Sequence, residues 1–378
     1  MALAAVMSVT ACGQNKKTLT MDKTTKIAES KRVVNNNLRD DIAEMLLVGF
    51  RGTELTENNH IRRDIEEHHI GGVILFEYDG ITGTHGRNIV SEKQLKKLCS
   101  QLQSASKETL FIGIDQEGGK VCRLGKKQGF PVIPSAEAMA KGGVDTVMRY
   151  SMLTAEILHR VGINLNFAPC VDVYNSNCPV IGNLGRSFGE EPDLIAQMAE
   201  AWIKGHEKAH VMCCLKHFPG HGNSTGDTHK GLVDVTEVWT PEEMEPYRIL
   251  CNKGIVDMVM TAHVVNEKWD GKTPASLNRH VNEILRNDIQ FDRIVITDDL
   301  CMGAITKMYP YKEVLQRAIA SGANLLCLSN NGDKYDEDLV PKTIKLICEL
   351  VEEGSIDAEN IHKSAEMIRK YKNKLQEN

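Results

Sequence analysis

Residues 211–222, VMCCLKHFPGHG, carry the signal that decides the fold. The apolar run that opens them predicts a short buried strand, and the strand stops abruptly at Lys216 and His217. Two glycines and a proline then break regular structure before Asp227 and His229. A capped loop with an incidental salt bridge accounts poorly for five Lys, His and Asp side chains within fourteen residues. The pattern instead indicates titratable groups mounted at the end of a rigid strand.

Outward from this strand, short apolar runs alternate with stretches of helical spacing along the chain. Eight strands alternating with eight helices are typical of a closed parallel barrel, so we predict an α/β fold, a single (β/α)8 TIM barrel. A doubly wound open sheet competes, but no GxGxxG follows the first strand. The predicted strands are 45–50, 72–76, 110–115, 163–168, 211–216, 257–263, 293–298 and 324–328. The predicted helices are 57–68, 91–106, 144–161, 192–208, 240–253, 282–288, 311–321 and 339–353, with a last one, 357–375, on the outside.

The composition fits one soluble globular domain of residues 38–378, because no repeat or Pro/Gly-rich linker divides them. A net charge of -6 argues against a nucleic-acid partner. No run of eighteen or more apolar residues appears, so no membrane span is predicted.

The first residues are interpreted separately. Residues 1–12 are apolar and small and end in Val9-Thr10-Ala11-Cys12, which resembles a bacterial lipobox. We therefore expect a signal segment, a lipid anchor at Cys12 and a flexible linker over 13–37. This predicts a place in the bacterial cell envelope, on the periplasmic or outer-membrane face. If the segment is instead a tail with a chance cysteine, the protein would be cytoplasmic.

Cysteines are numerous, at eleven, yet most lie inside apolar runs and are expected to pack as small hydrophobic residues. Cys170 and Cys178, in a polar stretch, are the one pair considered for a disulfide. No CxxC zinc pattern is present.

Reactive side chains gather where the predicted strands end. The third strand ends at Asp115, the fifth at Lys216, the sixth at His263, and the seventh at Asp298 and Asp299. The residues before the strands form no comparable cluster. Because the active site of a parallel barrel lies at the carboxyl ends of its strands, we expect these groups to meet there.

These groups suit the cleavage of a glycosidic bond. The reaction needs a carboxylate against an oxocarbenium-like transition state and an acid for the leaving oxygen. Asp298 at a strand tip and the Asp227–His229 pair on a loop could supply them, and histidine titrates near neutrality. The expected ligands of the sugar hydroxyls are Lys216, His217, Arg123 and Arg186.

Four motifs together resemble glycoside hydrolase family 3 of the β-N-acetylhexosaminidase type. They are KHFPGHGNSTGDTH (216–229), GIDQEGG (113–119), GRSFG (185–189) and TDDLCM (297–302). The resemblance covers roughly residues 38 to 350 and implies a (β/α)8 barrel, as the strand pattern does. It implies neither a metal nor a cofactor.

The resemblance implies a role for each matching residue. Asp298, rather than its neighbour Asp299, would be the nucleophile of a covalent glycosyl-enzyme. His229 would be the general acid and base, supported by Asp227. The residues expected to bind an N-acetylglucosamine (GlcNAc) ring are Asp115, Arg123, Arg186, Lys216 and His217. Outside this set, His221 is expected to shape the loop by bonding backbone carbonyls, His263 to form a wall or support, and Cys301 to pack.

The function expected from the resemblance is that of a retaining exo-β-N-acetylglucosaminidase that removes terminal β-linked GlcNAc, with peptidoglycan fragments as substrates. The Asp227-x-His229 loop favours this over a glucosidase. A β-N-acetylglucosaminide phosphorylase on the same scaffold is an alternative, because a histidine acid leaves less negative charge facing a phosphate. From other classes, a metal-dependent amidohydrolase with His217, His221, Asp227 and His229 as ligands, and a catalytically silent sugar-binding lipoprotein, stay open.

Overall fold

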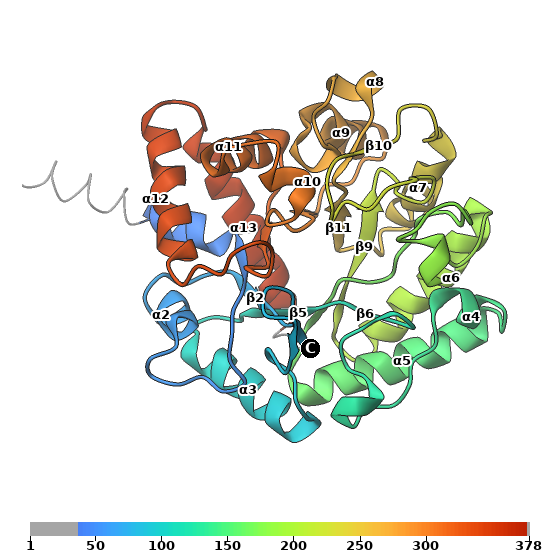
Figure 1. Cartoon of the computed structure of the whole chain (residues 1–378), viewed down its shortest axis with the longest axis horizontal. Helices are drawn as coiled ribbons and strands as arrows, with labels where there is room; N and C mark the ends of the chain where they lie inside the picture. Colours follow the sequence, from blue (N-terminus) through green and yellow to red (C-terminus); the bar gives the residue numbers. More distant parts are fainter. Residues whose placement is uncertain (1–36, 376–378) are drawn as a thin grey trace, which may run out of the picture.

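Eight short parallel strands form the centre of the structure, a computed structural model that describes residues 37–375 (Figure 1). They are β1 (Leu46–Gly49), β2 (Gly72–Ile74), β5 (Phe111–Ile114), β8 (Leu165–Asn166), β9 (Met212–Phe218), β11 (Met258–Thr261), β13 (Ile294–Thr297) and β14 (Leu326–Leu328). Each pairs with its neighbours in chain order, and β14 returns to pair with β1. The circle closes where the Thr297 N–H donates to the Leu325 carbonyl at 3.1 Å. The predicted (β/α)8 barrel is confirmed.

Helices surround the strands as an outer ring (Figure 1). They are α2 (His60–Glu66), α3 (Glu92–Ala105), α5 (Val144–Val161), α6 (Pro192–Glu207), α7 (Glu245–Asn252), α9 (Arg279–Glu283), α11 (Tyr311–Ser321) and α12 (Leu339–Glu352). Their ends follow local sequence signals. Ser91 caps α3 by accepting from the Gln94 N–H, and α5 ends at Gly162 in the left-handed conformation. All eight predicted helices are present.

Two helices are built differently from the prediction. The predicted helix 240–253 starts as a 3-10 helix, Pro241–Met244, before α7. Pro246 explains the change, because it has no N–H for the carbonyl of residue 242 and its ring would clash with that carbonyl in a continuous α-helix. The predicted helix 282–288 is the second half of a longer element, in which α9 runs into a π-helical turn, Ile284–Asp288.

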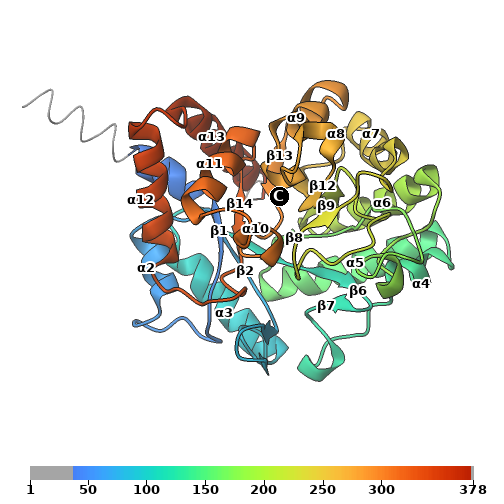
Figure 2. The same cartoon turned by 45° about the horizontal axis from the view of Figure 1, so that its top comes forward.

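Small elements that the sequence pattern did not predict follow the carboxyl ends of several strands and build the rim there. The pairs are β3 (Tyr78–Asp79) with β4 (Thr84–His85), β6 (Gln116–Gly118) with β7 (Val121–Cys122), and β10 (Val233–Asp234) with β12 (Val264–Val265). Short helices are α4 (Ala136–Ala140), α8 (Glu267–Asp270) and α10 (Gly303–Thr306), with 3-10 turns at Lys126–Gln128, Gly182–Leu184 and Ala275–Leu277. Figure 2 shows β6 and β7 as a separate hairpin beside the barrel strands.

The last helix, α13 (Ala358–Lys374), packs outside the barrel as predicted, and specifically across its amino end. Its Lys372 lies buried 5.5 Å above the ring of Phe111, the first residue of β5, and pairs with Glu44 at 2.5 Å. Arg369 pairs with Asp41 at 2.7 Å. The amino end of the barrel is therefore closed by ion pairs, while the carboxyl end stays open.

The predicted lipidated segment 1–12 lies outside the described residues, as does the predicted linker up to residue 36. Within residues 37–375, no helix is both long and apolar enough to span a bilayer.

Candidate active site

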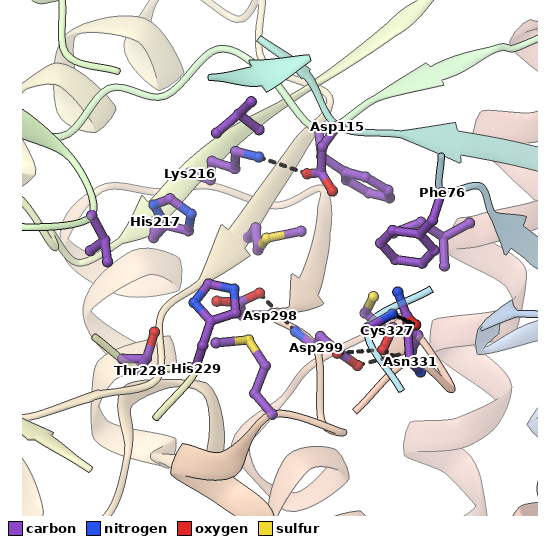
Figure 3. A pocket seen from close by; sticks show the side chains of 18 of the residues that line it. Phe76, Asp115, Lys216, His217, Thr228, His229, Asp298, Asp299, Cys327 and Asn331 are labelled. Atoms are coloured by element: carbon purple, nitrogen blue, oxygen red, sulfur yellow. Dashed lines mark hydrogen bonds and ion pairs between the residues drawn. The ribbon is translucent and has the colours of Figure 1, made fainter. Parts of the chain in front are cut away.

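A pocket of about 470 Å³ opens at the carboxyl ends of the barrel strands (Figure 3). Every side chain that the sequence assigned to the site lines it, although these residues come from the ends of three barrel strands and from three segments outside the barrel strands. These residues are Asp115, Arg123, Arg186, Lys216, His217, Asp227, His229 and Asp298. The barrel thus brings together groups that are as far apart in the chain as residues 115 and 298.

One wall of the pocket is a network of ion pairs around Lys216, which we call the charge lattice. The Lys216 ammonium, only 3% exposed, lies 2.8 Å from Asp115 Oδ1 and 2.7 Å from Glu117 Oε1. Arg186 holds the same Glu117 through two hydrogen bonds of 2.9 and 2.7 Å, and Arg123 approaches Asp115 at 3.3 Å. Buried charges are tolerated only when paired in this way.

The pKa values in this lattice keep every member charged at neutral pH. Burial alone would raise the pKa of Asp115, but Lys216 and Arg123 hold it well below its usual range. Burial acts likewise on Glu117, where Arg186 and Lys216 bring the pKa to about 2. Burial opposes the charge of Lys216, yet Asp115 and Glu117 raise its pKa above the ordinary value. The wall therefore presents fixed donors and acceptors to a polyhydroxylated ligand.

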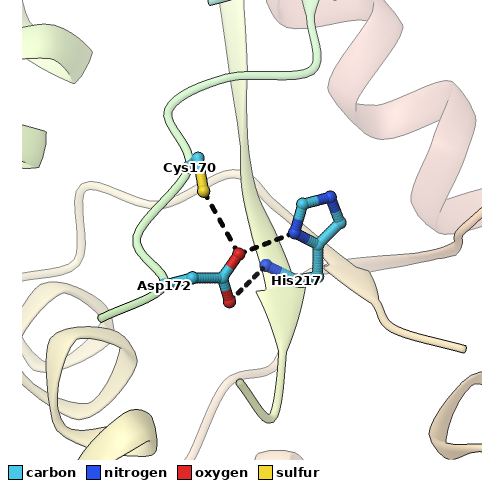
Figure 4. Close-up of side chains that lie close together, drawn as sticks. All are labelled: Cys170, Asp172 and His217. Carbon is cyan, nitrogen blue, oxygen red and sulfur yellow. Dashed lines mark hydrogen bonds and ion pairs between the residues drawn. The ribbon is translucent and has the colours of Figure 1, made fainter. Parts of the chain in front are cut away.

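His217 is oriented by a buried carboxylate that the sequence prediction missed (Figure 4). Asp172 Oδ2 lies 2.7 Å from His217 Nδ1 and also accepts a hydrogen bond from the Cys170 thiol at 3.1 Å. With its proton on Nδ1, His217 turns Nε2 towards Arg186, which lies 3.3 Å away. In this tautomer His217 Nε2 is an acceptor, and Arg186 is its donor in the structure.

Cys170 and Cys178, the one pair considered for a disulfide, are both free thiols in the structure. Each thiol has its own buried partner, Asp172 for Cys170 and the carbonyl of His221 for Cys178, at 3.1 and 3.5 Å. The polar surroundings of these two cysteines thus supply hydrogen-bond partners for their thiols.

Two buried acids, Asp172 and Glu243, hold the turn after β9 through hydrogen bonds to its backbone. The peptide bonds before His217 and Pro219 are both cis. Asp172 accepts from the His221 N–H at 2.9 Å, and Glu243 accepts from the Gly222 N–H at 2.9 Å. Gly220 fits because its φ is +127° and a Cβ there would lie 2.4 Å from that of Glu243.

His221 shapes this turn, but through different partners from those predicted. Its Nδ1 lies 2.7 Å from the Ser224 hydroxyl and its Nε2 lies 3.5 Å from the Thr228 hydroxyl. Burial lowers its pKa to about 4, so the ring is neutral near pH 7. Hydroxyl partners replace the predicted carbonyls because Ser224 and Thr228 face the ring inside the same loop.

Two adjacent aspartates follow β13 and lie in different environments. Asp299 is fully engaged: Ser329 Oγ donates to it at 2.5 Å, and the N–H groups of Ser329 and Cys301 donate at 2.9 and 3.0 Å. Among the described residues, only the Asp299 N–H donates to the Asp298 carboxylate, at 2.8 Å. Asp298 is therefore the aspartate that is free to act on a ligand in the pocket.

The pKa values of the two aspartates differ in direction. Burial raises the pKa of Asp299. Burial acts on Asp298 too, but electrostatic attraction from nearby histidine side chains, His263 first, and the hydrogen bond from the Asp299 N–H lower its pKa below the ordinary value. Asp298 is thus ionised at neutral pH, as a nucleophile must be.

Asp227 and His229 form a pair on the loop that crosses the pocket mouth. Asp227 Oδ1 lies 2.9 Å from His229 Nδ1 and also accepts the His229 N–H at 3.0 Å. The His229 side chain is 71% exposed, and in Figure 3 its ring and the Asp298 carboxylate both point into the pocket. The loop is docked on α10, where the Ala304 N–H donates to the Thr228 carbonyl at 3.2 Å.

His263 and Cys301 play supporting parts, as predicted. His263 is buried, with Nδ1 2.7 Å from the Ser276 hydroxyl and Nε2 2.9 Å from the Asp299 carbonyl. Burial raises the pKa of Cys301 well above its ordinary value, which removes the thiolate that a reactive cysteine needs.

Metal-ligand geometry is limited to one trio in the part of the chain that the structure describes. Cys170, Asp172 and His217 have ligand atoms within 4.8 Å of one another. The amidohydrolase alternative needs His217, His221, Asp227 and His229 together, and only His217 belongs to such a group.

Three acids of the site had no assigned role in the sequence analysis: Glu117, Asp172 and Glu243. Glu117 stands inside the motif 113–119, and Asp172 follows the predicted fourth strand, so the rule that strand ends carry function could have found both. Glu243 begins no motif and follows no strand, and only the packed structure places it beneath the turn.

Comparison with known proteins agrees with this geometry. The family model of the glycosyl hydrolase family 3 N-terminal domain matches residues 37–370. A β-hexosaminidase of Neisseria meningitidis serogroup C is 33% identical over 280 residues, which are 71% of this chain and 73% of the relative. A β-hexosaminidase of Vibrio cholerae serotype O1 is 32% identical over 297 residues, 78% of this chain and 85% of the relative.

Solved structures give the same result. The family 3 β-N-acetylglucosaminidase of Paenibacillus sp. FPU-7 superposes with a TM-score of 0.79 at 32% identity over 89% of this chain, which spans 62% of the Paenibacillus chain. A family 3 glycosyl hydrolase of Mycobacterium smegmatis has a TM-score of 0.73 at 28% identity, covering 88% of this chain and 96% of that one. The resemblance carried by the four sequence motifs is confirmed. The chain belongs to glycoside hydrolase family 3 and is a glycoside hydrolase.

Proposed function

We propose that this glycoside hydrolase is a retaining exo-β-N-acetylglucosaminidase. The observation that carries the proposal is the contrast between Asp298 and Asp299. The Asp298 carboxylate is ionised and free in the pocket, whereas the Asp299 carboxylate accepts hydrogen bonds from the barrel rim. The similarity of this chain to β-hexosaminidases and to a β-N-acetylglucosaminidase supports the choice of sugar.

In the first step, the Asp298 carboxylate attacks the anomeric carbon and the bond from that carbon to the leaving oxygen breaks. Protonated His229 donates the Nε2 proton to the leaving oxygen. Asp227, 2.9 Å from Nδ1, holds the ring in place before and after the transfer. The product is a glycosyl ester of Asp298.

In the second step, neutral His229 accepts a proton from water through Nε2 as the water oxygen attacks the anomeric carbon. The ester bond breaks and Asp298 recovers its negative charge. Two inversions at one carbon give overall retention.

The charge lattice would select the sugar ring. Asp115 accepts hydrogen bonds from hydroxyls, Lys216 and Arg186 donate to them, and His217 Nε2 accepts. Because these groups enclose one end of the pocket, they suit a terminal ring, which supports exo action.

We further propose peptidoglycan fragments with a terminal β-linked GlcNAc as natural substrates. The support is the predicted lipid anchor at Cys12, which would hold the enzyme in the cell envelope beside that polymer. Comparing kcat/KM for GlcNAc linked to anhydro-N-acetylmuramic acid with that for chitobiose tests it: a preference for chitobiose would count against the proposal.

The main test compares hydrolysis of p-nitrophenyl β-GlcNAc and the matching β-glucoside, with Asp298→Asn as control. We expect the GlcNAc substrate to be favoured and the variant to be inactive. A faster glucoside would contradict the sugar assignment. Repeating the assay with and without inorganic phosphate, and analysing the product, separates hydrolysis from phosphorolysis: sugar 1-phosphate as main product would favour the alternative.

A further inference from the structure

We propose that the β3–β4 hairpin carries the subsite for the leaving-group sugar, with Tyr78 as the platform on which its pyranose ring stacks. The inference rests on the proposed function, and it assigns specificity to a part of the rim that none of the four sequence motifs covers.

The hairpin begins at the pocket wall. Phe76, Glu77, Tyr78 and Gly80 all line the pocket, directly after β2. Figure 3 shows Phe76 and Asn331 on the side that lies across from Lys216 and His217. The hairpin therefore faces the charge lattice from the opposite wall.

Ion pairs of Asp79 with Arg87 and Arg51 hold the hairpin rigidly. Arg87, whose side chain is fully buried, donates to Asp79 at 2.9 Å and to the Asn331 side chain at 2.8 Å. Arg51 binds the same Asp79 carboxylate at 2.6 Å. A hydrogen bond from Arg51, against a smaller effect of burial, keeps the pKa of Asp79 well below its usual range, so these ion pairs persist at any physiological pH.

Asn331, in the loop after β14, also holds the hairpin. The Asn331 side chain accepts from the Gly80 N–H at 2.8 Å and donates to the Tyr78 carbonyl at 3.2 Å. The Asn331 side chain thus fixes the backbone on both sides of Asp79. A rim held in this way can present a side chain without rearranging when a ligand binds.

Tyr78 stands on this support with its ring in solvent. It is 40% exposed and touches His85 edge-on, with ring centroids 5.3 Å apart. Among the strongly exposed large apolar side chains of residues 37–375, it is the aromatic one. The C–H face of a pyranose is apolar, so an exposed aromatic ring beside a sugar pocket is a natural partner for it.

Two polar atoms near the start of the hairpin, one on Glu77 and one on Arg123 of the charge lattice, have no hydrogen-bond partner among the described residues. Glu77 Oε2 and Arg123 Nε are buried, and neither forms a hydrogen bond with any residue that the structure describes. Buried polar atoms are normally paired.

The occupant is the leaving group because a terminal ring can be extended in one direction only. If the charge lattice encloses the hydroxyls of the GlcNAc, the next sugar is attached through the anomeric carbon. That sugar must lie at the mouth, which is where the exposed Tyr78 ring stands.

The experiment compares two substrates that share GlcNAc but differ in the leaving group: chitobiose, with a sugar, and GlcNAc β-azide, with a group too small to reach Tyr78. We expect Tyr78→Ala to lower the ratio of kcat/KM for chitobiose to kcat/KM for the azide by roughly 2- to 12-fold, the range of an aromatic contact. Tyr78→Phe keeps the ring and should keep the ratio. Ile81→Ala, in the same hairpin but outside the pocket lining, is the matched control.

Binding provides a second readout without turnover. In an Asp298→Asn background, calorimetry should show weaker chitobiose binding after Tyr78→Ala, with the affinity for free GlcNAc retained. An unchanged ratio, or equal weakening of both ligands, would overturn the subsite. A wild-type enzyme that cleaves neither substrate would overturn the proposed function itself, and the inference with it.

Discussion

At the scale of single residues, the site separates two chemically identical side chains by their hydrogen bonds. Asp299 accepts three hydrogen bonds from the rim, whereas Asp298 accepts one from its neighbour's backbone. The protein thereby uses one aspartate as structure and leaves the other reactive.

This contrast predicts opposite results for two conservative variants. Asp298→Asn should lower kcat on p-nitrophenyl β-GlcNAc by roughly 10³-fold or more, which is about 4 kcal/mol, with little change in stability. Asp299→Asn turns an amide donor towards the Ser329 donors and should lower the free energy of unfolding by about 1–3 kcal/mol. Steady-state kinetics and urea denaturation of both variants check this. If Asp299→Asn abolished activity and Asp298→Asn mainly lowered the free energy of unfolding, Asp299 would be the nucleophile and Asp298 the structural residue.

The acid role of His229 predicts a dependence on the leaving group. His229→Ala should reduce kcat/KM by roughly 10²- to 10⁴-fold for chitobiose, whose leaving alcohol needs a proton. It should have much less effect on the 2,4-dinitrophenyl glycoside, whose phenolate leaves unaided. Asp227→Asn should act in the same direction. Equal losses on both substrates would show that His229 is not the acid.

At the scale of elements, the loop that carries Asp227 and His229 is supported by a buried acid beneath its first turn. Glu243 accepts from the N–H groups of Gly222 and Asn223 at 2.9 and 3.3 Å, and from the Asn223 side chain at 3.0 Å. Burial, with Asp172 nearby, raises the pKa of Glu243 to about 7. The turn is therefore sensitive to pH.

The sign of that dependence follows from proton linkage. The unfolded chain releases the Glu243 proton near its ordinary pKa of 4.5, whereas the folded protein keeps it up to about pH 7. The contribution of the Glu243 proton to the free energy of unfolding is complete below pH 4.5 and is lost as the pH rises to 7. Glu243→Gln mimics the protonated form, so the free energy of unfolding of the wild type should fall relative to this variant by about 3 kcal/mol across that window.

Urea denaturation of the wild type and Glu243→Gln at pH 5 and pH 8 measures this difference. Glu242→Gln, at the neighbouring exposed position, provides the matched control. If the difference between wild type and Glu243→Gln does not change with pH, the carboxyl is not titrating in this window.

The elements were predictable to different degrees, for physical reasons. Strands such as β9 and helices such as α5 follow from hydrophobic periodicity, because burial of one face dominates their energetics. The β3–β4 hairpin is two residues per strand and is stabilised by Arg87 and Asp79, contacts that no local pattern reveals. The split of the helix before α7 depends on a single residue, Pro246, rather than on the hydrophobic periodicity of the segment.

The site was predictable where a side chain acts from a strand end and was missed where it acts through another residue. Asp298 and Lys216 belong to motifs, and their places in the pocket match the expectation. Asp172 and Glu243 touch the backbone of the turn between residues 217 and 223, so their roles depend on packing across the barrel. Their long-range partners cannot be read from one sequence.

At the scale of the whole molecule, the barrel has a reactive end and a closed end. The pair of Lys372 and Glu44 ties α13 to the segment before β1, and both side chains are buried. Burial lowers the pKa of Lys372 and raises that of Glu44, which shows that each needs the other to stay charged.

Removing either Lys372 or Glu44 alone should therefore lower the free energy of unfolding strongly. Lys372→Met leaves Glu44 buried and unpaired, and the free energy of unfolding should fall by about 3–5 kcal/mol. Replacing both residues by apolar ones should recover most of the loss. Lys204→Met, which breaks the exposed pair with Glu200, should change little. Urea denaturation measures all three, and equal losses for Lys372→Met and Lys204→Met would contradict the account.

The measurement that tests the central claim most directly is trapping of the covalent intermediate. A 5-fluoro N-acetylglucosaminyl fluoride slows both steps, because its fluorine destabilises the oxocarbenium-like transition state, while the fluoride leaves readily. After digestion of the inactivated enzyme, mass spectrometry should find the sugar on the peptide that contains Asp298, attached at that residue. A label on Asp299, Asp227 or any other residue, or turnover that proceeds without a covalent intermediate, would contradict the assignment of the free carboxylate at the end of β13.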